Sequence, residues 1–146
     1  MAALTSTRST WVRAISTVQA PLPTSYTATE GGAACIDTAN LGAVYPAVSG
    51  STTLIPIGKF VSSVKNTSGS NINVSVKLDQ EVWVRNWDSV TGGGAVTISN
   101  QFAVVYMSSD HEVTTTSTSN SKAGRVWDVN GDGVWVEQPW AGQSST

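Results

Sequence analysis

The chain has 146 residues, of which 12% are charged, and its formal net charge at pH 7 is −2. It contains no run of basic residues and no apolar stretch long enough to span a bilayer, so we expect neither nucleic-acid binding nor membrane insertion. The single cysteine, Cys35, excludes an internal disulfide, and a chain of this length most simply forms one domain.

Residues 1–30 are predicted to form an extended N-terminal arm. Pro21 and Pro23 cannot donate backbone hydrogen bonds, and Trp11 begins a set of only three apolar residues at helical spacing, too few to predict a helix. A second interpretation is an organellar targeting peptide, because the segment is rich in serine and threonine and has no acidic residue before Glu30. The arm is the interpretation we prefer.

Residues 31–138 are predicted to form a β-rich domain, and two stretches in its first half illustrate why. The run at 53–64 is apolar but interrupted by Pro56 and Gly58, which favours an edge strand or a bulge over a central strand. The run at 72–78 alternates cleanly, and its apolar residues share one face: Ile72, Val74, Val76 and Leu78. We expect the end of the first run, residues 59–64 (KFVSSV), to pair with the second run as a hairpin.

The sequence EVWVRNWD at residues 81–88 alternates on both faces and places Trp83, Arg85 and Trp87 together on one of them. This aromatic ladder is open to two interpretations. It is either a surface that stacks sugars or anchors a protein partner, since Trp and Arg dominate interface hot spots, or a buried face with Arg85 stacked between two indoles.

Further along, residues 102–107 (FAVVYM) form a dense apolar run suited to a buried strand. Serine and threonine together make up about a quarter of the chain, a composition that suits strands and turns better than helices. Strands recur about every ten residues, and no helical pattern separates them. The predicted fold is therefore an all-β, single-domain small β-sandwich or barrel.

The segment around residues 128–133 matches the first half of a calcium-binding loop, with Asp128, Asn130, Asp132 and Gly133 in the ligand and turn positions. The closing carboxylate should fall at residue 139, which is a proline. Asn-Gly and Asp-Gly dipeptides are also the most favourable for tight turns between strands. We therefore predict the tip of a hairpin, with no metal and no other cofactor.

Catalytic residues are not predicted. His111 lies in the sequence SSDHE among serines and acids, but neighbours in sequence diverge in a turn or strand and make poor partners in a catalytic triad. Cys35, between Ala34 and Ile36, is expected in the core and not as a nucleophile. A hydrolase centred on His111 is the weakest of the functional interpretations.

Two tryptophans lie outside the predicted domain, Trp11 in the arm and Trp140 in the C-terminal tail of residues 139–146. Large side chains in terminal segments are hard to explain as part of a monomer's core. Together with Trp83, Arg85 and Trp87 they are the predicted contacts with a partner.

The order of several motifs resembles that of capsid cement, or head-decoration, proteins of tailed bacteriophages. These motifs occupy residues 52–78 and 120–137, with EVWVRNWD and SSDH between them. The resemblance implies a small β-rich structural protein without catalytic residues that forms homotrimers on the outer surface of the phage head. There it would bind the major capsid protein and stabilise contacts between its subunits, which places it in the virion. The alternative is a carbohydrate-binding β-domain on a virion or cell surface, with Trp83 and Trp87 as its stacking platform.

Overall fold

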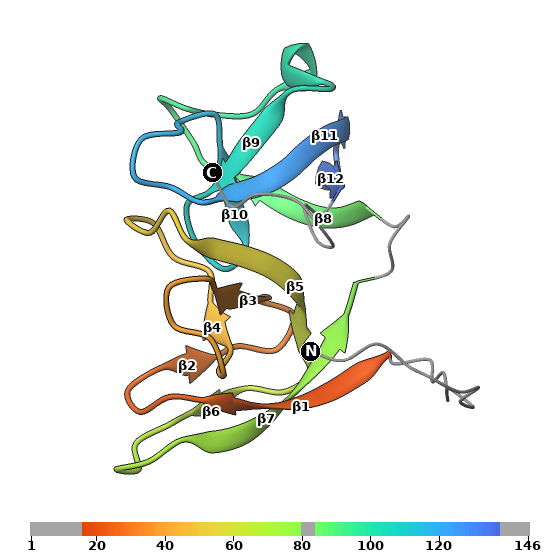
Figure 1. Ribbon diagram of the computed structural model, residues 1–146. Coiled ribbons are helices and arrows are strands. Elements are labelled where there is room, and N and C mark those ends of the chain that lie inside the picture. Colours follow the sequence, from red (N-terminus) through yellow and green to blue (C-terminus); the bar gives the residue numbers. More distant parts are fainter. Residues whose placement is uncertain (1–15, 80–83, 138–146) are drawn as a thin grey trace, which may run out of the picture.

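The computed structural model describes residues 16–79 and 84–137, and nearly all of its regular structure is β-strand (Figure 1). The elements, in chain order, are β1 (Thr17–Leu22), β2 (Thr27–Ala28), β3 (Ala33–Asp37), β4 (Tyr45–Pro46), β5 (Leu54–Phe60), β6 (Val64–Lys65), β7 (Ile72–Leu78), β8 (Val84–Ser89), the short 3₁₀ helix η1 (Ile98–Asn100), β9 (Val104–Met107), β10 (Glu112–Thr114), β11 (Lys122–Asn130) and β12 (Gly133–Glu137). Within the described ranges, no helix has the length and hydropathy to cross a membrane.

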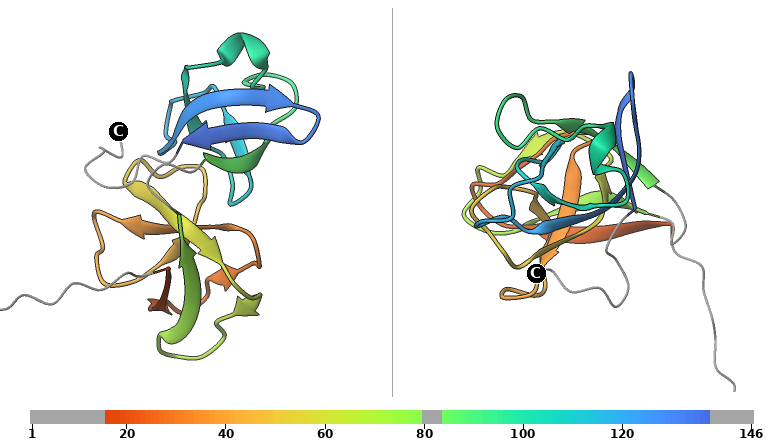
Figure 2. Two further views of the ribbon diagram at one scale, coloured as in Figure 1. Left: turned by 90° about the vertical axis from the view of Figure 1, so that its right-hand side faces the viewer. Right: turned by 90° about the horizontal axis from the view of Figure 1, so that it is seen from above.

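The strands form two parts that are stacked on one another (Figures 1 and 2). The first part, here the sheet half (residues 16–79), contains a five-stranded sheet of order β1-β7-β5-β3-β4 and a small ribbon of β2 and β6. The second, the barrel half (residues 84–137), is a closed barrel of order β10-β8-β12-β11-β9. The predicted all-β class is confirmed, and the barrel is the form that the second half takes.

Strand β7 shows the predicted alternation. Val74 and Val76 are buried, whereas Asn73 and Lys77 are exposed. The buried face contributes to a cluster made entirely by the sheet half: Leu22, Ala28, Ala34, Val44, Ile57, Phe60, Val74 and Val76. The end of β5 pairs antiparallel with the end of β7, with Phe60 opposite Val76, so the predicted pairing is confirmed for Lys59 and Phe60. It is wrong for Val64, which lies in β6 and pairs with β2 instead.

The predicted arm boundary at residue 30 is wrong. Thr17–Leu22 form β1, which pairs with β7 along its whole length and ends at the fully buried Leu22. Pro21 fits there because β1 is an edge strand of the sheet, where a missing N–H breaks no ladder bond on the solvent side. The remainder of the predicted arm, residues 1–15, lies outside the described residues, as does the tail of residues 139–146.

Strand β5 is central in the sheet, so the expectation of an edge strand is wrong, whereas the alternative of a bulge is confirmed. The pairing with β3 shifts between Ala34 opposite Gly58 and Cys35 opposite Pro56, which leaves Ile57 as the extra residue. A Cβ at Gly58 would collide with the backbone carbonyl of Lys77 on β7. The glycine therefore permits the close approach of two strands, and the proline sits beside the bulge.

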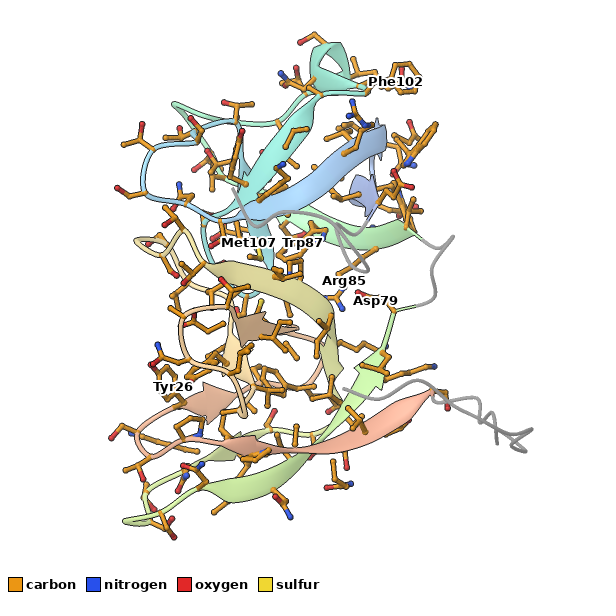
Figure 3. The ribbon with its side chains drawn as sticks, in the orientation of Figure 1. Tyr26, Asp79, Arg85, Trp87, Phe102 and Met107 are labelled. Carbon is orange, nitrogen blue, oxygen red and sulfur yellow. The ribbon has the colours of Figure 1, made fainter. Side chains whose placement is uncertain are left out.

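The two halves share a second cluster of buried residues, so they form one body. Trp87 and Met107 from the barrel half pack with Cys35 and Leu54 from the sheet half (Figure 3). Polar contacts reinforce this seam between the halves. The hydroxyl of Ser121 in the barrel half accepts a hydrogen bond from the Leu54 amide at 3.0 Å and donates one to the Ser51 carbonyl at 2.8 Å, and both partners belong to the sheet half.

Candidate functional site

The aromatic ladder predicted in β8 is a buried structural feature where the structure describes it. Trp87 is only 1% exposed, and the Arg85 guanidinium carbon lies 5.6 Å from the centre of its ring. Arg85 Nη2 also donates to both carboxylate oxygens of Asp79 at 3.0 Å (Figure 3). Burial makes Trp87 unavailable to a partner, so this part of the prediction is corrected, whereas Arg85, whose Nη2 is held by Asp79, stays a predicted contact. Trp83 lies outside the described residues.

The segment with the calcium-loop resemblance forms the predicted hairpin. Asn130, the last residue of β11, is paired with Gly133, the first of β12. Its side-chain oxygen accepts hydrogen bonds from the Asp132 amide at 2.8 Å and from the Trp135 indole at 3.3 Å, while an Asp128 carboxylate oxygen accepts from the Val129 amide at 2.9 Å. These oxygens shape the turn. In residues 16–79 and 84–137, no group of three or more histidine, cysteine, aspartate or glutamate side chains is gathered at one place.

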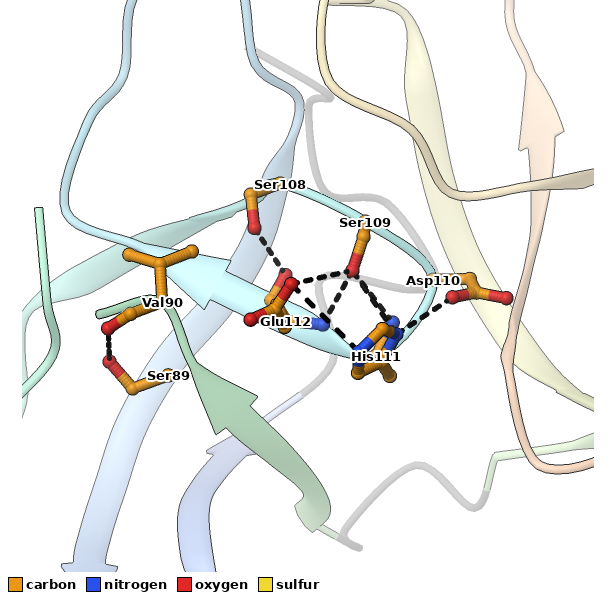
Figure 4. Close-up of polar contacts among 7 residues, drawn as sticks. All are labelled: Ser89, Val90, Ser108, Ser109, Asp110, His111 and Glu112. Atoms are coloured by element: carbon orange, nitrogen blue, oxygen red, sulfur yellow. Dashed lines mark hydrogen bonds and ion pairs between the residues drawn. The ribbon is translucent and has the colours of Figure 1, made fainter.

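The loop around His111 has neighbours of the types found in a hydrolase, but their arrangement differs from a catalytic triad (Figure 4). Both the Ser109 hydroxyl, at 3.3 Å, and an Asp110 carboxylate oxygen, at 3.0 Å, contact the same ring nitrogen, Nδ1. A triad requires the nucleophile and the acid to be hydrogen-bonded to opposite ring nitrogens, and the carboxylate beside Nε2, that of Glu112, is 3.8 Å away, beyond hydrogen-bonding distance. The hydrogen bond with Asp110 raises the pKa of His111, whose side chain is 61% exposed.

Cys35 is fully buried and lies 3.9 Å from the thioether sulfur of Met107. Burial strongly raises the pKa of its thiol, because the surrounding core cannot solvate a thiolate. A nucleophilic cysteine needs the thiolate form. The position of Cys35 in the core therefore matches the sequence prediction.

An exposed apolar cluster lies on the barrel half, at the end far from the sheet half, where Figure 3 labels Phe102. We call it the aromatic patch and define it as Ile98, Phe102 and Trp127, which are 56%, 53% and 46% exposed. The rings of Phe102 and Trp127 meet edge to face, with centroids 5.7 Å apart and planes at 84°. Such a pair exposes a large apolar surface in a fixed relative geometry.

The backbone around Phe102 is held in a strained conformation. Its φ of 70° is in the left-handed region, which a bulky residue rarely occupies. The Phe102 amide donates to the Val126 carbonyl at 2.7 Å, and its carbonyl accepts from Arg125 Nη1 at 2.6 Å. Strain of this kind persists only where the surroundings fix it, and it concentrates at functional positions.

The backbone of Trp127 is irregular as well. The pairing of β11 with β12 shifts between Val126 and Asp128, so Trp127 is the bulged residue of the hairpin. Its carbonyl accepts a hydrogen bond from the Gln101 side chain at 2.8 Å, which ties the bulge to the segment that carries Phe102. Bulges are common where a side chain must be re-aimed toward a functional surface.

Sequence reasoning did not find the aromatic patch. Phe102 belongs to the dense apolar run that predicts a buried strand, but β9 begins two residues later, at Val104. The alternation of β11, in which Val126 is buried and Arg125 and Trp127 are exposed, was the signal that could have identified Trp127 as a surface residue.

Comparisons with models of protein families, with curated proteins and with solved structures give no match.

Proposed function

We propose that this protein is a capsid cement protein that binds the outer surface of a phage head and stabilises contacts between subunits of the major capsid protein. The observation that carries the proposal is the aromatic patch of Ile98, Phe102 and Trp127, an exposed and rigidly held apolar surface on a β-barrel. The order of motifs at residues 52–78 and 120–137 supports the choice of this class of structural protein.

The patch has the composition of an interface hot spot. Tryptophan and other aromatic side chains supply most of the binding free energy at the centres of protein interfaces. The backbone carbonyls of Phe102 and Trp127 also accept hydrogen bonds from Arg125 and Gln101, so the backbone that carries the patch loses little conformational entropy when a partner covers it. A pre-organised aromatic pair of this kind is suited to docking on a fixed protein surface.

A cement protein stabilises a shell by linkage, because it binds the mature lattice more tightly than the open or disassembled one. Many copies act on one lattice, and in a homotrimer each docked subunit raises the effective concentration of the others. Trp11 and Trp140, which lie outside the described residues, are further predicted contacts with neighbouring subunits. We place the protein in the virion, after assembly in the host cytoplasm.

The test is binding of the purified full-length chain to expanded heads that lack decoration, prepared from the virus that encodes it. Saturable co-sedimentation is expected for the wild type. Trp127→Ala should weaken binding by about 30-fold, equivalent to the loss of about 2 kcal/mol of a hot-spot contact. Leu41→Ala provides the control, because Leu41 is 75% exposed but lies in the sheet half and outside the aromatic patch.

Three results would overturn the proposal: no saturable binding to expanded heads, equal binding to unexpanded heads, or a Trp127→Ala protein that binds like the Leu41→Ala control. Sedimentation equilibrium of the free protein tests the homotrimer separately, and a monomer at all accessible concentrations would contradict that part.

A further inference from the structure

A groove of about 430 Å³ opens at the seam between the two halves of the molecule. Three segments line it: the turn into β2 with β2 itself, the residues that follow β4, and the loop between β9 and β10. Its hydroxyl groups come from Ser25, Thr27, Thr29, Ser49, Ser108 and Ser109. The groove is shallow and widely open to solvent, and its volume lies within the range of about 300–1,000 Å³ found for ligand sites. We call it the seam groove.

One aromatic ring lines the seam groove. Tyr26 is 38% exposed, and Tyr45 contacts it edge to face, with centroids 5.2 Å apart and planes at 81° (Tyr26 is labelled in Figure 3). The backbone of Tyr26 is fixed as well, because the Tyr26 carbonyl accepts a hydrogen bond from the Asn66 amide at 2.9 Å. A tyrosine held in this way offers an apolar ring and a polar hydroxyl to the same ligand.

One carboxylate, that of Asp110, also lines the seam groove. An oxygen of this group, Oδ1, contacts His111 at 3.0 Å (Figure 4). Among the described residues no donor contacts the other oxygen, Oδ2. The Asp110 carbonyl accepts from the Ala33 amide at 2.7 Å, so the sheet half positions this loop of the barrel half. A carboxylate that retains free lone pairs is a strong acceptor for ligand hydroxyl groups.

These groups define the chemical class of the ligand. Hydroxyls both donate and accept hydrogen bonds, a carboxylate only accepts, and an aromatic ring contacts C–H surfaces. A saccharide combines hydroxyl groups with apolar C–H faces. None of the lining residues, all of which are described, is lysine, arginine or histidine, so a phosphate or an acidic sugar would meet no cation among the side chains that line the groove. We propose that the seam groove binds a neutral saccharide.

This site differs from the stacking platform of Trp83 and Trp87 expected from the sequence, since Trp87 is buried. It also shares no residue with the aromatic patch. Saccharide binding is thus a second activity, independent of docking to a capsid, and each of the two can be lost without the other.

A glycan array of neutral and acidic oligosaccharides, probed with the full-length protein, is the first test, followed by titration of the best neutral ligand by NMR. Saturable binding of the neutral class is expected. Tyr26→Ala and Asp110→Asn should each weaken it at least about tenfold, and Tyr26→Phe, which keeps the ring, should retain most of it. The matched control is Trp127→Ala, which also removes an exposed aromatic ring but should leave saccharide affinity unchanged.

Head co-sedimentation of the same variants separates the two activities, because Tyr26→Ala should still bind expanded heads. The proposal is overturned if no neutral saccharide binds, if only acidic ones bind, or if Trp127→Ala alone abolishes binding. It is equally overturned if Asp110→Asn and Tyr26→Ala both bind like wild type. Asp110→Asn preserves the shape of the side chain, so its loss of binding keeps the test valid if Tyr26→Ala fails to fold.

Discussion

Among single residues, Asn66 illustrates how a buried polar group stabilises the turns of the sheet half. It is 1% exposed, and its amide nitrogen donates to the carbonyls of Leu22 at 2.8 Å and Ser70 at 2.9 Å. Its side-chain oxygen accepts from the amide and the hydroxyl of Ser68, at 3.0 and 2.7 Å. Every polar atom of the side chain therefore has a partner, which is the condition for burying an amide without a large cost.

Replacing Asn66 by alanine should destabilise the fold by about 2–3 kcal/mol, because the buried Leu22 carbonyl loses its donor. Asn73→Ala is the matched control: Asn73 also heads an Asn-x-Ser sequence, but it is exposed on β7, and its loss should cost less than about 0.5 kcal/mol. Urea unfolding of the wild type and both variants measures the free energy of unfolding that each substitution removes. Equal losses for the two variants would show that the hydrogen bonds of Asn66 contribute little.

The pKa of His111 leads to a prediction about pH. The hydrogen bond that the ring donates to the Asp110 carboxylate raises this pKa, and burial opposes the rise. The negative charges of Asp110, Glu112 and Asp88 also favour the protonated ring. Because the pKa is higher in the folded state, the stabilisation is fully present below the unfolded value of about 6.5 and is lost as pH rises through the folded value. The side chain is 61% exposed, so the effect is small.

We therefore expect the wild type to lose more thermal stability than His111→Gln when the pH is raised from about 5.5 to about 8.5. Melting temperatures of the two proteins across this range, in the same low-salt buffers, provide the measurement. Parallel pH profiles would mean that the contact with Asp110 does not favour the protonated ring.

Among the elements, β11 depends on a close approach between backbones. It pairs with both β9 and β12, and its register against β9 shifts between Lys122 and Gly124. Gly124 has a φ of 143°, and a Cβ there would collide with the backbone carbonyl of Glu137 on β12. Only glycine can adopt this φ and also leave room for the Glu137 carbonyl, so the closure of the barrel depends on position 124.

Gly124→Ala should therefore destabilise the protein by about 3–4 kcal/mol, the sum of a steric overlap with backbone and an unfavourable φ. The control is Gly131→Ala at the tip of the same hairpin, where an added Cβ would meet nothing within 4 Å. Denaturant unfolding gives both values. A Gly124→Ala protein as stable as the control would show that β12 can move away from β11 without loss.

Local patterns predicted those elements whose partners are near in sequence. The alternation of residues 72–78 identified β7 and its buried face, and the turn dipeptides at 130–133 identified the hairpin of β11 and β12. In both cases the period of the side chains and the conformational preferences of glycine and asparagine act within a few residues. Such information is present in a single sequence.

Partners that are distant in sequence were not predictable in this way. Strand β1 was assigned to an arm because its stabilising partner, β7, lies more than fifty residues further along the chain. The outward direction of Phe102 depends on a φ of 70° fixed by Val126 and Arg125, which no local pattern reveals. Similarly, the seam groove exists only because three separate loops meet there. The candidate sites were therefore largely hidden from the sequence.

At the scale of the whole molecule, the two halves are joined by a common core and by an ion pair. Cys35 and Leu54 of the sheet half share a buried cluster with Trp87 and Met107 of the barrel half. Asp79, just after β7, forms its ion pair with Arg85 near the start of β8, and both side chains are largely buried, at 17% and 11% exposure. Contacts of this extent predict that the halves unfold together.

Leu22→Ala tests this cooperativity. Leu22 belongs to the cluster made only by the sheet half. The described tryptophans all belong to the barrel half: Trp87, Trp127 and Trp135. A cavity at this fully buried leucine should cost about 2–5 kcal/mol. If the molecule is one cooperative unit, tryptophan fluorescence and far-ultraviolet circular dichroism will report the same loss in the free energy of unfolding in a urea titration. The matched control, Leu41→Ala, removes the same atoms from a side chain that is 75% exposed and should leave both unfolding midpoints at the wild-type value. A fluorescence midpoint that stays at the wild-type value while the dichroism midpoint falls would show that the barrel is stable without the sheet, and that the shared core is too weak to couple them.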